Sequence, residues 1–119
     1  MRRVIYIAHP VRGDVPGNRA KIVEICESLT SKNPEIFAWA PYLQSITHLD
    51  DTVVEDRALG IRINTACLRS GVVDELWLFG DTISEGMRAE IALARSLGIP
   101  VVAKTEGTAR DLAARSDTP

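Results

Sequence analysis

LWLFGDTISEGMRAEI, residues 76–91, joins an apolar run to a polar stretch with two glutamates. The second, Glu90, is spaced so that it falls beside apolar residues if the stretch is helical. The apolar run predicts a buried strand, and the small residues after it predict a turn that opens a helix. Ligands of open α/β sheets bind in the crevice beyond the carboxyl ends of the strands. This stretch therefore predicts that Glu90 lies about one turn into a helix at such a crevice.

The same alternation of apolar runs and amphipathic stretches continues on both sides of residues 76–91. Strands are predicted at 4–8, 35–40, 75–79 and 101–104, helices at 18–29, 54–70, 86–97 and 108–115, and irregular loops at 9–17 and 41–54. Strands that alternate with helices favour a parallel sheet with helices on both faces. We expect an α/β fold, a flavodoxin-like three-layer sandwich with a four- or five-stranded parallel sheet.

Length and composition indicate one ordinary globular domain, residues 1–119. The apolar fraction is 45%, and the net charge of −2 comes without a basic block, so a nucleic-acid partner is not expected. No run reaches the roughly 18 apolar residues that span a bilayer, and the apolar start is too short for a signal peptide. We expect a cytoplasmic protein without a membrane partner, whose thiols, Cys26 and Cys67, are reduced and lie in the core.

Familiar cofactor and catalytic motifs are missing. The chain has no P-loop, no G-x-G-x-x-G after its first strand and no G-x-S-x-G elbow. Its two cysteines and two histidines show no paired spacing that would indicate a metal site. We therefore expect no metal and no other cofactor.

The remaining chemistry gathers at the predicted strand ends. Glu90 borders the apolar stripe of its helix, where burial raises a carboxyl pKa and a helix N-terminus or a tyrosine bond favours the anion. Such a carboxylate suits covalent catalysis at an anomeric carbon. The amides of Gly86 and Met87 can hold an anion at the helix start. The alternative is an ordinary surface glutamate paired with an arginine.

The chain also resembles a known family. A start of Tyr6-Ile7-Ala8 and the pattern Ser84-x-Gly86-x-x-x-Glu90-Ile91 are similar to those of the nucleoside 2-deoxyribosyltransferase superfamily, which includes the 2′-deoxynucleoside 5′-phosphate N-hydrolases. The resemblance covers nearly all of residues 4–104, and it is closest to a set of small phage and bacterial members.

The resemblance implies roles for individual residues. Glu90 matches the nucleophile that takes the deoxyribosyl C1′, and Tyr6 matches the tyrosine that orients it. The residues expected to bind substrate or its 5′-phosphate are His9, Pro10, Arg12, Gly13, Ser84, Gly86 and Met87. A homodimer or larger assembly is expected by the same analogy.

Several residues allow two interpretations. Asp81 either holds a sugar hydroxyl or assists proton transfer to the base, or it is a turn aspartate. His9 either contacts ligand or caps a strand end. His48 and Asp50 either cover the base or lie in a solvated loop. The expected function is cleavage or transfer at the N-glycosidic bond of a nucleoside or its 5′-monophosphate. The alternative is a non-catalytic nucleotide-binding or sensing module of the same fold.

Overall fold

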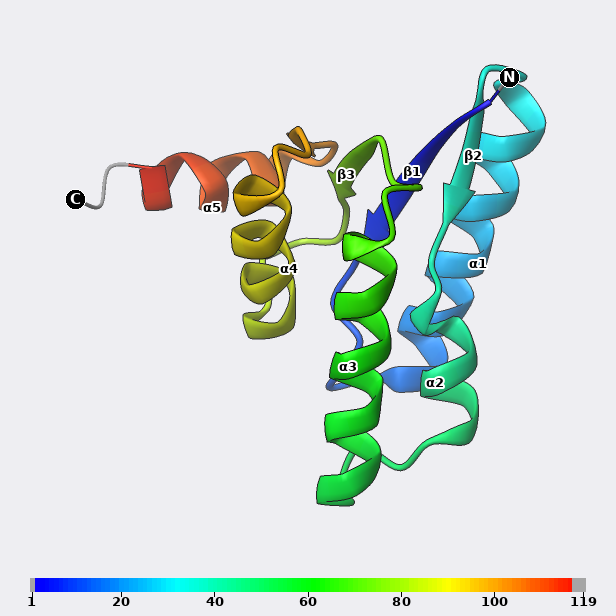
Figure 1. The fold of residues 1–119 in the computed structure, drawn as a ribbon, viewed down its shortest axis with the longest axis vertical. Coiled ribbons are helices and arrows are strands. Elements are labelled where there is room, and N and C mark those ends of the chain that lie inside the picture. Colours follow the sequence, from blue (N-terminus) through cyan, green and yellow to red (C-terminus); the bar gives the residue numbers. More distant parts are fainter. Residues whose placement is uncertain (1, 117–119) are drawn as a thin grey trace.

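A computed structural model describes residues 2–116, which form four parallel strands and five helices (Figure 1). The elements follow one another as β1 (Arg3–Ala8), α1 (Val15–Lys32), β2 (Ile36–Trp39), α2 (Tyr42–His48), α3 (Val54–Arg69), β3 (Glu75–Leu78), α4 (Glu85–Ser96), β4 (Val101–Ala103) and α5 (Glu106–Ser116). The predicted α/β class and the parallel sheet are confirmed.

The sheet has the strand order β2-β1-β3-β4, with all three pairs parallel, as in the flavodoxin-like arrangement. The connection from β1 to β2 runs in one direction across the sheet, and those from β2 to β3 and from β3 to β4 run in the other. Right-handed crossovers therefore place α1 on one face and the contacting helices α3 and α4 on the opposite face. These are the three layers of the predicted sandwich.

Alternation along β1 separates the core into two halves. Tyr6 is aligned with Leu76 of β3, and Ile7 is aligned with Trp77, so the two pairs point to opposite faces. The largest fully buried side chains are Tyr6, Ile5, Ile7, Ile22, Leu68, Leu76, Leu78, Met87 and Thr108. Trp39 and Trp77, on β2 and β3, pack against this core but stay partly exposed.

Two boundaries differ from the sequence prediction at the start of the chain. Helix α1 begins at Val15 rather than after Asn18, because the Asp14 side chain caps it by accepting the Gly17 N–H. Pro16 lies in the first turn, where the missing N–H of proline costs no hydrogen bond. Residues 9–17 are therefore only partly loop.

The segment predicted to be a long loop, 41–54, contains the seven-residue helix α2. Its first residue, Tyr42, is buried, and the Tyr42 hydroxyl donates a hydrogen bond to the Ile7 carbonyl at 2.5 Å. Tertiary packing of this side chain stabilises a helix too short to be stable by itself. No periodic pattern in the sequence reveals such a contact.

Helix α3 is less buried than its apolar pattern predicts. Leu59 and Ile63, which recur at a helical spacing, are 37% and 36% exposed, whereas Leu68 near the other end of the helix is 2% exposed. Sixteen helical residues span about 24 Å, while four strand residues span only about 13 Å. The first half of α3 therefore projects beyond the sheet.

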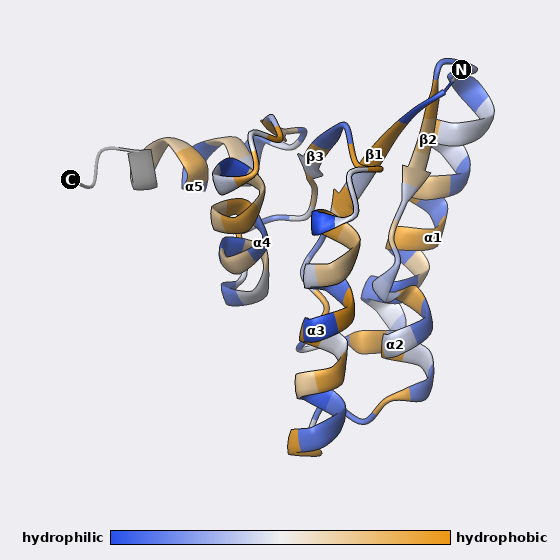
Figure 2. Cartoon of the chain, viewed as in Figure 1, coloured by the Kyte–Doolittle hydropathy of each residue, from blue (hydrophilic) through white to orange (hydrophobic). Residues whose placement is uncertain are grey.

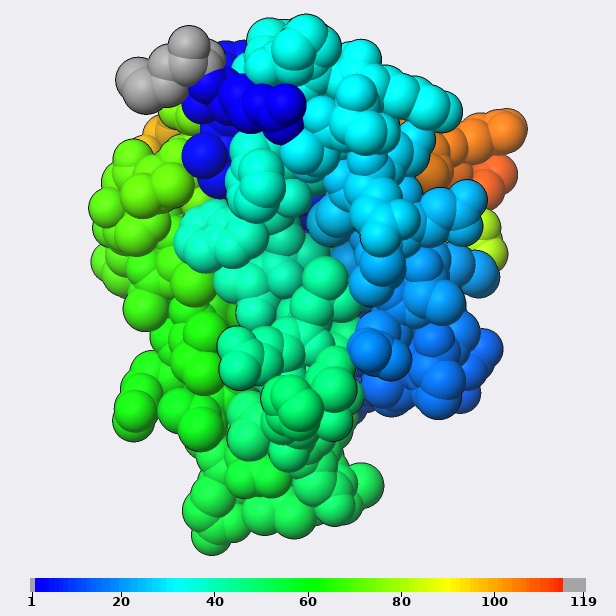
Figure 3. All heavy atoms as spheres, turned by 90° about the vertical axis from the view of Figure 1, so that its right-hand side faces the viewer, coloured from blue at the N-terminus to red at the C-terminus, as the bar shows by residue number. Residues whose placement is uncertain are grey.

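The projection is visible in three views. It forms the lower end of the molecule in Figure 1, and Figure 2 shows that apolar residues continue to that end of α3. In Figure 3 the junction of α2 and α3 makes the narrow base of the molecule. Within residues 2–116, no helix combines the length and apolar character that crossing a membrane requires.

Candidate functional site

The central feature of the carboxyl edge is a hydrogen bond between β1 and α4. The Tyr6 hydroxyl donates to Oε2 of Glu90 at 2.5 Å, across 84 positions of sequence. The parallel register points Tyr6 toward the α3–α4 layer, and α4 carries Glu90 back over β1. The fold thus brings together the two residues to which the resemblance gave the nucleophile and orienting roles.

The carboxyl group of Glu90 is enclosed although the residue as a whole is only partly buried. Burial raises the pKa of Glu90 to about 7, and the hydrogen bond from Tyr6 acts in the opposite direction. Burial also raises the pKa of Tyr6 well above its ordinary value, and the nearby Glu90 charge adds to this effect. At neutral pH, Tyr6 therefore keeps its proton while Glu90 is present in both ionisation states.

A second tyrosine supports this pair. The rings of Tyr6 and Tyr42 lie 6.1 Å apart at an interplanar angle of 46°, within the range of favourable aromatic contacts. Because its hydroxyl is bonded to the Ile7 carbonyl, Tyr42 holds α2 against β1 beside Tyr6. No sequence pattern predicts a role for Tyr42, because the segment 41–54 has the irregular composition of a loop.

The start of α4 is held by a cap. Ser84 Oγ accepts the Met87 N–H at 3.3 Å, and the Ser84 N–H approaches Met87 Sδ at 3.5 Å. The Met87 side chain is buried, and its N–H donates to Ser84 Oγ within the cap. Gly86 is exposed and has no atoms within 4 Å of the position that a Cβ would take. Its N–H, at the second helical position, has no intrahelical partner.

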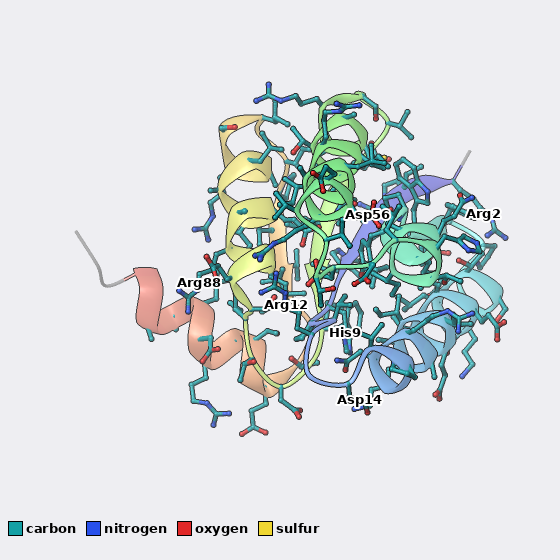
Figure 4. The ribbon with its side chains drawn as sticks, turned by 90° about the horizontal axis from the view of Figure 1, so that it is seen from below. Arg2, His9, Arg12, Asp14, Asp56 and Arg88 are labelled. Atoms are coloured by element: carbon teal, nitrogen blue, oxygen red, sulfur yellow. The ribbon has the colours of Figure 1, made fainter. Side chains whose placement is uncertain are left out.

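Arg12 and Gly13 lie in the loop between β1 and α1. Arg12 Nε donates to Asp51 Oδ2 at 2.8 Å, which joins this loop to the one before α3. Gly13 has a φ of +95°, a conformation that favours glycine. Viewed onto the edge where the strands end, Arg12 and His9 lie near the centre, while Arg88 lies on the outer side of α4 (Figure 4). Arg12 is thus near the site but engaged by a carboxylate that the sequence did not assign to it.

His9, Pro10 and Asp81 belong to a cavity on the other side of β1. This cavity of about 250 Å³ is lined by His9, Pro10, Asn18, Lys21, Gly80, Asp81 and Thr82. The cavity lies on the α1 side of the sheet, because Asn18 and Lys21 of α1 line it, whereas Tyr6 points toward α4. The sequence placed His9 and Asp81 at the strand ends, but it gave no ligand role to Asn18, Lys21 or Thr82. The i, i+3 spacing of Asn18 and Lys21 could have shown that both side chains lie on the same face of α1.

A further cavity, of about 330 Å³, lies at the opposite edge of the sheet, where Arg69 and Asp74 contribute to its wall. Asp74, just before β3, accepts the Val4 N–H at 2.8 Å through Oδ2 and so joins β1 to the start of β3. Glu90 lines neither of these two cavities.

Within residues 2–116, no group of three or more histidine, cysteine or acidic side chains is arranged to hold a metal ion. The chain has no match among curated proteins. A family model described as a domain of unknown function (DUF7768) matches residues 3–104, and because this range covers most of the chain, the protein belongs to that family.

Proposed function

We propose that this protein cleaves or transfers the N-glycosidic bond of a nucleoside or nucleoside 5′-monophosphate, with Glu90 as the nucleophile. The observation that carries the proposal is the hydrogen bond from Tyr6 to one oxygen of Glu90. It fixes the orientation of the carboxylate and leaves the other oxygen to react. The resemblance to the nucleoside 2-deoxyribosyltransferase superfamily supports the choice of substrate class.

The proposed reaction has two steps. Ionised Glu90 forms a bond from its free oxygen to C1′ of the sugar, while the C1′–N bond breaks and the base leaves with the bonding electron pair. The departing base takes up a proton from water, and Asp81 is proposed to assist this transfer. Water, or a second base, then forms a bond to C1′ while the C1′–O bond to Glu90 breaks. Glu90 leaves as a carboxylate, and the proton lost by the attacking group passes to solvent. Tyr6 stabilises the ionised carboxylate and remains protonated throughout, consistent with its raised pKa.

The start of α4 and Arg12 are the proposed ligands of a 5′-phosphate. Ser84 Oγ accepts a bond within the cap, so its own O–H stays available to donate to a phosphate oxygen. The Gly86 N–H and the guanidinium of Arg12 supply further donors. Binding of a phosphate by Arg12 competes with the ion pair from Arg12 to Asp51.

The second candidate is a nucleotide-binding or sensing module without turnover. It is favoured by one observation, namely that Glu90 borders neither of the two cavities described above. In that case the Tyr6–Glu90 bond is a structural contact between β1 and α4.

The deciding experiment measures free-base release from a panel of nucleosides and nucleoside 5′-monophosphates by chromatography. Release by the wild type, and a loss on the order of 10³-fold or more in Glu90→Gln, is the expected result for an essential nucleophile. Glu27→Gln, an exposed glutamate on α1, is the matched control and should keep full activity. Binding of a substrate without release of base by the wild type would establish the sensing module instead.

The homo-oligomer and the cytoplasmic location remain part of this proposal. Val54 and Ile61 on the projecting half of α3 are 79% and 58% exposed, so they are the residues to replace in a test of assembly. We expect sedimentation of the wild type to give a dimer or a larger species. A monomer at micromolar concentration would contradict this expectation.

A further inference from the structure

The cavity lined by His9 and Lys21 occupies a special position in the topology. The connection after β1 leaves toward α1, and the connection after β3 leaves toward α4, on the opposite face. The neighbouring strands β1 and β3 therefore form the point where the winding of the sheet reverses. In open α/β sheets, ligands bind in the crevice at this point. The residues that follow these two strands, His9 with Pro10 and Gly80 with Asp81, line the cavity.

The floor of the cavity is fixed by close packing. Gly80 has a φ of +94°, and a Cβ at this position would lie 2.6 Å from Pro10 Cδ. The proline ring thus packs directly on the glycine backbone, which joins the loops after β1 and β3. The Gly80 carbonyl also accepts a bond from the Thr105 hydroxyl at 2.6 Å. A cavity built on such contacts is largely formed before a ligand arrives.

His9 presents a defined nitrogen to this cavity. Its Nδ1 lies 2.7 Å from the Pro10 carbonyl, and a carbonyl oxygen only accepts hydrogen bonds. Nδ1 therefore carries a proton, and Nε2 of the neutral ring is an acceptor. Nε2 lies 3.7 Å from the position of a Cβ on Gly80, at the cavity floor.

The other side chains add both donors and acceptors. Lys21, from α1, contributes three N–H donors, and the Asp81 carboxylate accepts hydrogen bonds. A simple anion would gain from Lys21 but would be repelled by Asp81. A neutral ring with a donor and an acceptor on adjacent atoms satisfies both, with one face against Pro10.

We propose that this cavity is the subsite for a nucleobase, in which Lys21 donates to a base acceptor and His9 or Asp81 accepts from a base N–H. Sites for drug-sized ligands usually have about 300–1,000 Å³. The volume of about 250 Å³ therefore suits one heterocycle rather than a whole nucleotide. The choice of a base as the ligand rests on the proposed function, although the donor and acceptor set is a property of the cavity itself.

The test uses the two histidines as reporters, because the chain contains only His9 and His48. The ring resonances, assigned with a His48→Gln variant, are followed by nuclear magnetic resonance while adenine, cytosine, hypoxanthine or uracil is added at millimolar concentration. We expect at least one base to shift the His9 signals saturably and to leave those of His48 unchanged. Unsubstituted pyrimidine, which has no N–H donor, should produce much smaller shifts.

Lys21→Met should weaken base binding about tenfold, which is what the loss of one charged donor predicts. The matched control is Lys32→Met, an exposed lysine about 16 Å away along the same helix. Failure of every base to shift His9, equal binding by Lys21→Met, or a preference for inorganic phosphate over all bases would overturn the proposal.

The two proposals fail separately. Base binding that depends on Lys21, without base release from any nucleotide, would contradict the proposed catalytic function and support the proposed subsite. Base release by the wild type that is unchanged in Lys21→Met would support the proposed catalytic function and contradict the proposed subsite.

Discussion

The two sides of β1 at its carboxyl end differ in how far their polar side chains are exposed to solvent. On the α4 side, the Glu90 carboxyl is enclosed and bonded to a fully buried tyrosine. On the α1 side, Lys21, Asp81 and Thr82 are exposed around a cavity, and only His9 is buried. Enclosure changes the protonation of one acid, whereas the open cavity keeps several donors and acceptors available to a ligand. The first arrangement favours chemistry, and the second favours recognition.

The largest expected effect concerns the contact that fixes the open side. Gly80→Ala forces a side chain onto a residue with a φ of +94° and against Pro10, so we expect a loss of about 2–4 kcal/mol in unfolding free energy. Gly98→Ala is the matched control, since Gly98 has a φ of +74° but no atom within 4 Å of its Cβ position, and should cost only about 1 kcal/mol. Urea denaturation measures both. Equal losses of unfolding free energy in the two variants would show that Pro10 moves away from the new methyl group at no cost.

The enclosed side predicts a pH-dependent stability. Between pH 4.5 and about 7, folded Glu90 keeps a proton that the unfolded chain has released. Stability should therefore fall as pH rises through this window, by at most roughly 3 kcal/mol from this group. Glu90→Gln should remove that fall and be more stable than the wild type at pH 8. The unfolding free energy of both proteins is measured by urea denaturation as a function of pH. Parallel profiles would contradict the claim that the Glu90 carboxyl is enclosed.

Tyr6→Phe tests whether the hydrogen bond matters for chemistry. A bond to a charged group contributes about 1.5–3 kcal/mol, so we expect base release to fall roughly 10- to 100-fold. The bond lowers the pKa of Glu90, so its loss should also move the acid limb of the kcat/KM profile to higher pH. Tyr42→Phe, which loses only the bond to Ile7, should leave that limb near its wild-type position. A profile of Tyr6→Phe with an unshifted limb would mean that the bond is purely structural.

The smallest effect is expected between the two loops. Asp51→Asn removes the partner of Arg12, but both side chains are more than half exposed, so stability should change by less than about 1 kcal/mol. The freed guanidinium should bind nucleoside 5′-monophosphates a few-fold more tightly and leave the affinity for nucleosides unchanged. Calorimetric titration with both classes measures the difference. Equal changes for the two classes would exclude Arg12 as a phosphate ligand.

Much of the fold was predictable because local signals agreed with the tertiary structure. The continuous apolar character of β1 and β3 reflects strands covered on both faces. The predicted helix 86–97 ends just before Gly98, which has the positive φ of +74° that such a helix end favours. The predictions for α3 were less accurate, because a periodic pattern does not show how far a helix extends beyond its sheet.

The site was predictable only in part. The residues at the strand ends were found because every parallel strand delivers its following loop to the same edge. The sequence does not predict which of these residues lie on each face of the sheet, since this depends on the direction of each crossover. Tyr42 and Asp51 lie in a segment without periodicity, and their partners, Ile7 and Arg12, are distant in sequence.

The sequence by itself determined the order of the four strands and of every helix except α2, the parallel sheet and the presence of Glu90 near the start of α4, because these follow from local apolar patterns and turn residues. Only the tertiary structure decided which polar groups meet. The Tyr6–Glu90 bond and the cavity beside His9 arise from strand register and crossover direction, which bring together residues that no local pattern connects.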